Sequence, residues 1–279
     1  MLNILKIANR VALTSACFIA SASALPRVWV SPQGVDVGTC GSATSPCKTF
    51  QFATALVDAN GEISVRDPGD FGAVSINKSL SIVNHTGGTA AIGTPLIGQT
   101  AVTVGVGAGD VYLHGLTLNG FGKGQTGILH SGNGKLVIAD LIIQNFTNGV
   151  ICSNADSTLI LRSSILLKNA NFGARLVSNK TEIFKTSFSG SLYGLAIGSS
   201  ATVGKNATAI ITDSEISQNT LGLVIAAATV SIGETKIFKN STGIINSSAM
   251  PPVVNSYQNN YILSNGTDVV GTLTPVTLK

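Results

Sequence analysis

The chain has 279 residues, only 11% of them charged, and a formal net charge of +4 at pH 7. Because this charge is small and its cations are scattered, the sequence lacks the basic surface that nucleic acid or an anionic membrane would attract, and we expect no nucleic-acid partner. The 31 glycines, together with many Asn and β-branched residues, favour a chain built from short strands and tight turns.

The first 24 residues are typical of an export signal. Lys6 and Arg10 precede a short apolar stretch, and an Ala-Ser-Ala sequence ends at Ala24. We predict a Sec-type signal peptide at 1–24, cleaved after Ala24, and a secreted, periplasmic or cell-surface location. The apolar stretch is too short for a permanent membrane span, so we expect no transmembrane segment after cleavage. The alternatives are an N-terminal core helix and a lipoprotein anchor on Cys17.

Residues 25–60 are predicted to form an N-terminal strand, a disulfide loop and a capping helix. Cys40 and Cys47 lie in a loop rich in Gly, Ser and Pro, and export would bring them into an oxidising compartment, so we predict a disulfide between them. A metal site is the alternative, but no His or third Cys lies nearby. Phe52 and Leu56 have helical spacing, which favours a short amphipathic helix that covers the end of the following repeat.

A repeat of about 23 residues dominates the remainder of the chain, 61–279. Each unit contains three short strands joined by polar turns, and such strands bury their apolar side chains only when successive units stack. We therefore predict an all-β fold, a single-stranded right-handed parallel β-helix of about nine three-strand coils. A six-residue pattern marks the units, and its copies begin at Asp140, Ser164, Thr186, Ser214, Thr235 and Asn260.

Two columns follow from aligning these copies, and an earlier copy at 79–84 also fits the pattern. The third position points inward and would form an apolar spine of Ile142, Leu166, Phe188, Ile216, Ile237 and Ile262. The sixth position holds Asn145, Asn169, Ser191, Asn219, Asn240 and Asn265. An Asn amide both donates and accepts, so stacked copies can hydrogen-bond from coil to coil, and Asn tolerates the left-handed backbone of a sharp corner.

The segment 62–83 contains a strand, a Pro-Gly turn, an aromatic residue and two further strands, in that order. Together with the segments 31–34 and 46–50 and the later Asn-bearing coils, it resembles the pectin-lyase-like superfamily, in particular secreted bacterial proteins described only as right-handed parallel β-helix repeat proteins. The resemblance covers residues 28–279. It implies the fold rather than an activity, because this superfamily includes lyases, hydrolases, esterases, epimerases, phage tailspikes and adhesins.

The motifs of the enzymatic branches are missing from the sequence. It has no Asn-Thr-Asp, Asp-Asp or Gly-His-Gly motif of polygalacturonase-like hydrolases, and no evident set of Asp calcium ligands with an Arg or Lys base. We therefore expect no metal ion and no cofactor. The favoured hypothesis is an exported non-catalytic β-helix, a structural or binding module that faces polysaccharide or a cell-envelope glycan. The alternative is a polysaccharide lyase or glycoside hydrolase.

Three residues are weak catalytic candidates. Asp213 and Glu215 are two apart on a predicted strand, and Lys236 occupies the column of Glu215 one coil on. A carboxylate pair with a basic neighbour suits acid–base chemistry, but we favour a solvated ion pair worth at most about 1 kcal/mol. Asp67 and Asp70 flank the Pro-Gly turn, where we favour a turn role over calcium binding.

The histidines and the third mature cysteine give no metal-like spacing. We expect surface or turn roles for His85, His114 and His130, and a buried unreactive thiol at Cys152, with a reactive thiol as the alternative. Few large aromatic side chains are available for stacking on sugars, and no aromatic stripe is predicted from Trp29, Tyr112, Tyr193, Tyr257 and Tyr261.

Overall fold

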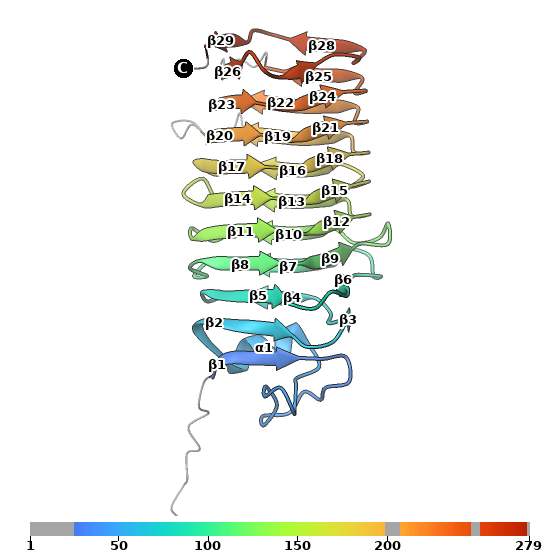
Figure 1. The fold of residues 1–279 in the computed structure, drawn as a ribbon, viewed down its shortest axis with the longest axis vertical. Helices are drawn as coiled ribbons and strands as arrows, with labels where there is room; N and C mark the ends of the chain where they lie inside the picture. The colour runs from blue at the N-terminus through green and yellow to red at the C-terminus, as the bar shows by residue number, and fades with distance from the viewer. Residues whose placement is uncertain (1–24, 199–206, 247–251, 278–279) are drawn as a thin grey trace, which may run out of the picture.

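The structure, a computed structural model, describes residues 25–198, 207–246 and 252–277. It is a right-handed parallel β-helix, as predicted, and forms an upright stack of coils (Figure 1). The predicted signal peptide and its alternatives, Cys17 among them, lie outside the described residues. Within the described ranges, no helix is long and apolar enough to cross a membrane.

Three parallel sheets, A, B and C, form the walls of the helix. Sheet A contains β1 (Leu25–Val30), β2 (Val57–Val65), β5 (Leu80–Asn84), β8 (Val111–His114), β11 (Lys135–Ala139), β14 (Thr158–Arg162), β17 (Lys180–Phe184), β20 (Ala207–Thr212), β23 (Ala228–Gly233), β26 (Val253–Tyr257) and β29 (Thr274–Val276). Sheet B contains β3 (Gly69–Asp70), β6 (Ala90–Gly93), β9 (Leu116–Asn119), β12 (Ile142–Gln144), β15 (Ile165–Leu167), β18 (Ser187–Ser189), β21 (Glu215–Ser217), β24 (Lys236–Phe238) and β27 (Tyr261–Ile262). Sheet C contains β4 (Val74–Ile76), β7 (Thr100–Val104), β10 (Thr126–His130), β13 (Asn148–Cys152), β16 (Phe172–Leu176), β19 (Tyr193–Gly198), β22 (Leu221–Ala226), β25 (Thr242–Ile245) and β28 (Thr267–Val270).

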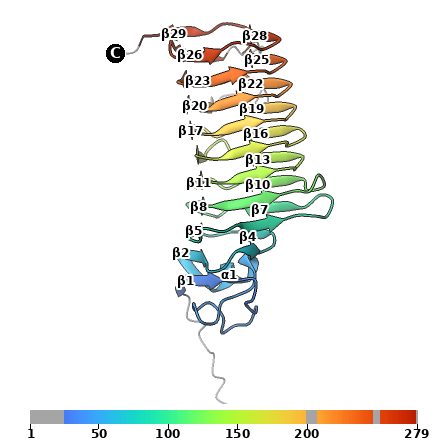
Figure 2. The same ribbon diagram turned by 45° about the vertical axis from the view of Figure 1, so that its right-hand side comes forward.

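Each coil takes one strand from each sheet, and the strands from β2 to β28 make nine three-strand coils. Figure 2 shows sheets A and C as neighbouring stacks of strands. Because the strands pair in parallel and in register, each inward side chain lies on its counterpart one coil away, at about 4.8 Å. The core fills the space between the sheets; one of its columns in sheet A is Ile63, Ile82, Leu113, Ile138, Leu161, Ile183, Ile211 and Ile232.

The predicted spine lies in sheet B, but its first member was wrong. Ile143, not Ile142, pairs with Leu166, and Ile142 is 38% exposed. Side chains alternate along a strand, so a one-residue slip turns the predicted inward residue outward. The same slip displaces Asn145, because the sixth position of this coil belongs to Phe146, whose N–H donates to Asn169 Oδ1 (3.2 Å). The assignment of residues 79–84 to the same repeated pattern was also wrong, because this segment lies in sheet A rather than sheet B.

A ladder of asparagines joins the last coils at the corner between sheets B and C. The amide of Asn219 donates to Oδ1 of Asn240 (3.1 Å), and the amide of Asn240 donates to Oδ1 of Asn265 (2.9 Å). Each amide also reaches the preceding coil, as Asn240 Nδ2 does when it donates to the carbonyl of Ile216 (2.9 Å). Asp268 ends the ladder by accepting from the backbone N–H and the amide of Asn265.

The left-handed backbone of this corner lies one residue before the Asn column. The φ angle is +52° at Lys168, +57° at Gln218 and +56° at Lys239, whereas the ladder asparagines have negative φ. The amide hydrogen bonds between coils, and not tolerance of a left-handed backbone, therefore account for Asn at the sixth position.

The N-terminal end of the stack is covered by α1 (Phe50–Leu56), as Figure 1 shows. Phe50 is buried and stacks on Phe71, with ring centroids 4.7 Å apart, whereas Phe52 and Leu56 are only partly buried. The carboxylate of Asp36 fixes the start of the helix by accepting from two backbone N–H groups and one hydroxyl. A disulfide joins Cys40 to Cys47 and closes the loop that precedes the helix.

Candidate functional site

The three weak candidates lie together on the outside of sheet B. Glu215 and Lys236 pair across β21 and β24, and Asp213 lies at the preceding corner, with its carboxylate 3.9 Å from the amine of Lys185. Glu215 Oε1 accepts a hydrogen bond from Ser217 Oγ (2.8 Å). An open depression of 230 Å³ adjoins these side chains.

This group has the character of a solvated ion-pair surface. The side chains of Asp213 and Lys185 are 47% and 57% exposed, so water screens their attraction to about 1 kcal/mol or less. Glu234 adds a third carboxylate to the depression. No residue of the group is buried in a way that would tune it for proton transfer, and its catalytic role stays a prediction.

A second group of ionisable and aromatic side chains lies on the outer face of sheet A. The strand register places these residues in adjacent columns, because Arg27, Glu62, Ser81 and Tyr112 follow one another and Trp29, Ser64, Val83 and His114 do the same. We call this surface the sheet-A face and define it by Arg27, Trp29, Glu62, Ser64, Ser81, His85, Tyr112, His114, Asp140 and Arg162.

Glu62 organises the N-terminal half of the sheet-A face. Its Oε1 lies 3.3 Å from Arg27 Nε and 3.1 Å from His85 Nε2, and it also accepts from the Ser64 hydroxyl. Partial burial acts to raise the pKa of Glu62, but the hydrogen bonds from Ser64 and His85 and the charge of Arg27 outweigh it and lower the pKa. The ionised carboxylate therefore orients Arg27, whose guanidinium lies 5.7 Å from the centre of the Trp29 ring.

Tyr112 and Arg162 organise the other half. Arg162 Nη2 donates to Tyr112 Oη (3.4 Å) across the intervening strand β11, in which Val137 is the counterpart of Tyr112 and Ala139 the counterpart of Arg162. The ring of His114 stacks near that of Tyr112, with centroids 5.9 Å apart. His114 Nε2 lies 3.1 Å from a carboxylate oxygen of Asp140, and His114 Nδ1 is buried without a hydrogen-bond partner.

A depression of 340 Å³ adjoins Tyr112 on the same face. Lys135 and Asp110 form part of its wall: the Asp110 carboxylate accepts from the Lys135 backbone N–H (3.1 Å) and lies 3.2 Å from its amine. The hydrogen bond from the Lys135 backbone N–H is the main cause that lowers the pKa of Asp110; burial opposes it, and the hydrogen bond and charge of the Lys135 amine lower the pKa further. Ser81 and Val137 also line the depression, so it combines polar groups with an apolar patch.

Sequence reasoning placed these residues separately because it aligned only the strands of sheet B. Tyr112 and Arg162 are fifty residues apart, and two coil periods of sheet A bring them together. The coil period of sheet A, followed from β2 through β14, is the signal in the sequence that would have brought these residues together.

The remaining polar candidates have structural roles. Asp70 Oδ1 accepts from the backbone N–H groups of Gly72 and Gly93, and Asp67 lies 3.6 Å from Arg66, as the turn interpretation expects. Across the described ranges, no three His, Cys, Asp or Glu side chains gather where they could hold a metal ion.

His130 departs from the expected surface position, because it is fully buried in the core beside Cys152. Its Nδ1 lies 3.6 Å from the Cys152 sulfur, which also contacts the Ser157 hydroxyl at 3.1 Å. Burial lowers the pKa of His130 to about 4 and raises the pKa of the Cys152 thiol, so both groups are neutral at pH 7. A buried neutral thiol fits the unreactive role expected for Cys152.

Comparison with known proteins identifies the fold. No family model and no curated protein matches the chain. A crystal structure of pectate lyase Pel9A matches with a TM-score of 0.61 and 16% identity, covering 92% of this chain and 76% of that one. A rhamnogalacturonan lyase matches with a TM-score of 0.52 and 13% identity, covering 87% and 84%. The chain therefore shares the parallel β-helix fold of these two lyase structures, the fold that the resemblance in its sequence implies.

Proposed function

We propose that this chain is an exported, non-catalytic β-helix that binds polysaccharide through the sheet-A face. One observation carries the proposal. Two aromatic side chains, Trp29 and Tyr112, and two arginines, Arg27 and Arg162, lie in two neighbouring columns on the outer face of one sheet. The two solved structures compared above are named as a pectate lyase and a rhamnogalacturonan lyase, which supports a glycan as the ligand.

The chemistry of these side chains suits a sugar chain. Aromatic rings offer a flat apolar surface with low conformational entropy, and planar guanidinium groups offer several N–H donors to hydroxyl or carboxylate oxygens. Arg27 is held by Glu62 and Trp29, and Arg162 by Tyr112. Because these contacts order the side chains before a ligand arrives, less entropy is lost on binding.

The non-catalytic part of the proposal rests on how the carboxylates of this face are engaged. Glu62 is bonded to Arg27, His85 and Ser64, and Asp140 contacts His114. Held by several donors, Glu62 is a weak proton acceptor, whereas a general base needs a free lone pair directed at its substrate.

Export is part of the same proposal. A signal peptide at 1–24, cleaved after Ala24, would leave an N-terminal unit at 25–60 and the β-helix at 61–279, in the periplasm, at the cell surface or outside the cell. The Cys40–Cys47 disulfide supports this route, because such bonds persist in oxidising compartments. The mass of the exported protein tests it, since a chain that retains residues 1–24 would contradict cleavage.

A polysaccharide lyase or glycoside hydrolase is the second candidate. The names of the two structural neighbours favour it. So does the presence of Tyr112, His114 and Arg162 on one face, because such side chains can transfer protons or stabilise negative charge during a reaction. The depression beside Tyr112 could accept part of a sugar chain.

Binding and turnover assays on one polysaccharide panel test both candidates. We expect the protein to bind at least one uronic-acid or neutral polysaccharide without releasing reducing ends or unsaturated product, with or without calcium. Trp29→Ala and Tyr112→Ala should each weaken binding about tenfold, whereas Tyr261→Ala, which removes an exposed tyrosine on sheet B, should not. Equal losses in all three variants would contradict the assignment of the face.

The variants also separate the catalytic alternatives. Turnover that disappears in Arg162→Ala would overturn the non-catalytic proposal in favour of an enzyme acting on the sheet-A face. Turnover that survives in Arg162→Ala but disappears in Asp213→Ala or Glu215→Ala would place the chemistry at the sheet-B candidates instead.

A further inference from the structure

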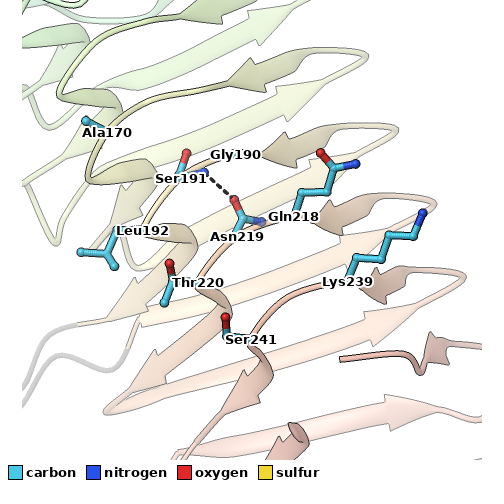
Figure 3. Close-up of a pocket in the computed structure, with 9 residues that line it drawn as sticks. All are labelled: Ala170, Gly190, Ser191, Leu192, Gln218, Asn219, Thr220, Lys239 and Ser241. Carbon is cyan, nitrogen blue, oxygen red and sulfur yellow. Dashed lines mark hydrogen bonds between the residues drawn. The ribbon is translucent and has the colours of Figure 1, made fainter. Parts of the chain in front are cut away.

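The corner between sheets B and C carries an open groove of 650 Å³ beside the Asn ladder (Figure 3). It extends over successive coils, and Gln218 and Lys239 project outward from it in Figure 3. We call it the corner groove and define it by Gly190, Ser191, Gln218, Thr220, Lys239 and Ser241.

The groove coincides with a break in the Asn ladder. Ser191 occupies the ladder position of its coil, between the coils of Asn169 and Asn219, and its backbone N–H donates to Asn219 Oδ1 (3.0 Å; Figure 3). The Ser191 hydroxyl cannot bridge the coils as an Asn amide does. The residue is only 6% exposed, and its buried Oγ has no hydrogen-bond partner. A buried hydroxyl without a partner is costly, so a rotation of the Ser191 side chain that brings Oγ to a ligand in the groove would be favoured by the hydrogen bond it forms.

The residue before Ser191 opens the outer side of the same break. Gly190 occupies the left-handed corner position that Lys168, Gln218 and Lys239 occupy in other coils, with φ of +72°. It carries no side chain, so it contributes only backbone atoms to the wall of the groove. A Cβ at Gly190 would lie 3.3 Å from Lys168 Cγ, so the stem of Lys168 packs against this position from the preceding coil.

The charge of the groove has one sign. Lys239 is its one charged lining residue, and no acidic side chain lines it within the part of the chain that the structure describes. Neither Lys168 nor Lys239 has a carboxylate within 4.0 Å among those residues, whereas Lys135, Lys180 and Lys185 each have one. Two lysines without a counter-ion next to several neutral hydrogen-bonding groups favour an anionic ligand that also carries hydroxyl groups.

We propose that the corner groove binds the carboxylate of an acidic sugar residue in a polysaccharide. Lys239 and Lys168 supply the positive charge, the amide of Gln218 and the hydroxyl of Thr220 hydrogen-bond the sugar, and the Ser191 hydroxyl gains a partner. This site lies at a different corner from the sheet-A face and goes beyond the proposed function, because binding at either surface does not require the other.

Titration of the full mature chain with trigalacturonic acid tests the proposal, with the fully methyl-esterified trisaccharide as the uncharged comparison. Lys239→Gln and Lys168→Gln should each raise the Kd for the acid about tenfold, and the methyl ester should bind much more weakly than the acid. The matched control is Lys123→Gln, an exposed lysine on an earlier coil, which should leave the Kd unchanged.

Three results would overturn this site. They are an unchanged Kd in both groove variants, equal binding of acid and methyl ester, and an equal loss in Lys123→Gln. If Tyr112→Ala abolishes binding while the groove variants retain it, the ligand binds on the sheet-A face and the corner groove is rejected without loss of the proposed function.

Completing the ladder provides an independent test. In the preceding coil the corresponding residues are Leu166 and Asn169, whereas this coil has Phe188 and Ser191. The Phe188 ring lies beside Gly173, where an amide would have to fit, so the double variant Phe188→Leu, Ser191→Asn is the matched replacement. This double variant should both raise the urea midpoint and weaken the binding of trigalacturonic acid. Unchanged binding in a folded double variant would contradict the role of Ser191. If the double variant does not fold, the lysine variants decide whether the corner groove binds the acid.

Discussion

Acid should weaken the β-helix through one core residue, His130. Its side chain lies in an inward column of sheet C between Val104 and Cys152, and it is fully buried. Its Nε2 has no hydrogen-bond partner, and its Nδ1 faces only the Cys152 sulfur, so nothing in contact with the ring compensates a positive charge. Burial accordingly lowers the pKa of His130 from 6.5 to about 4.

The sign follows from proton binding in the two states. Between about pH 6.5 and pH 4 the unfolded chain binds a proton at this histidine and the folded chain does not, so the free energy of unfolding decreases as the pH falls through that window. Above pH 6.5 both states are neutral and the effect vanishes. At about 1.36 kcal/mol per pKa unit, the loss is about 3 kcal/mol by pH 4.

Urea unfolding at a series of pH values from about 7 to about 4 measures this loss, with His130→Leu as the comparison. The wild type should lose about 3 kcal/mol more than His130→Leu over the range. Glu62 and Asp110 also have lowered pKa values, but both proteins share them, so their contribution cancels in the comparison. Parallel pH profiles of wild type and His130→Leu would refute the reasoning.

Two further predictions concern the N-terminal cover and the ladder. Replacing Cys40 and Cys47 by Ala should lower the free energy of unfolding by about 2–3 kcal/mol on the loop-entropy model. It should also speed amide hydrogen exchange around α1 more than in the later coils. An equal increase in exchange along the whole chain would contradict a local role of the disulfide. Asn240→Ala removes the acceptor of two hydrogen bonds from Asn219 and the donor to the Ile216 carbonyl, so it should lower the free energy of unfolding by at least about 2 kcal/mol. Gln144→Ala, on the outside of sheet B, should lower it by less than about 0.5 kcal/mol. Similar urea midpoints for the two variants would contradict a stabilising role of the ladder.

The repeat made the fold predictable because stacking imposes a chemical rule on each inward position. Apolar residues recur at the coil period, and Asn recurs where its amide can join two coils. The prediction slipped at 140–145 because Leu141, Ile142 and Ile143 are all apolar, and a pattern of apolar residues does not distinguish adjacent candidates. In four of the other five copies a Ser or Thr at the first position sets the register, since its hydroxyl bonds within the corner, as Ser164 and Ser214 do; in the last copy the amide of Asn260 does so.

The outer surfaces were harder to predict because stacking imposes no rule on side chains that face solvent. Arg27, Glu62 and Tyr112 share one column, but their residue types differ, so no repeat marks them. Only the pairing of strands in sheet A brings them together. His130 was misplaced for the opposite reason: a polar residue in an inward column violates the rule that gives the rest of the core.

Departures from the repeat are informative when nothing else in the structure compensates for them. Phe146 also replaces Asn at the ladder position, but its ring is buried and fills the space beside Gly120, Gly124 and Gly127, so packing replaces the lost amide bonds. At Ser191 the Phe188 ring fills the inner side only, the hydroxyl keeps no partner, and Gly190 leaves the outer side open. The coil of Ser191 loses a ladder hydrogen bond without a compensating contact, and it lies next to lysines without counter-ions. Such a loss of stability is typical of a binding site. We therefore assign a ligand to the corner groove and none to the coil of Phe146.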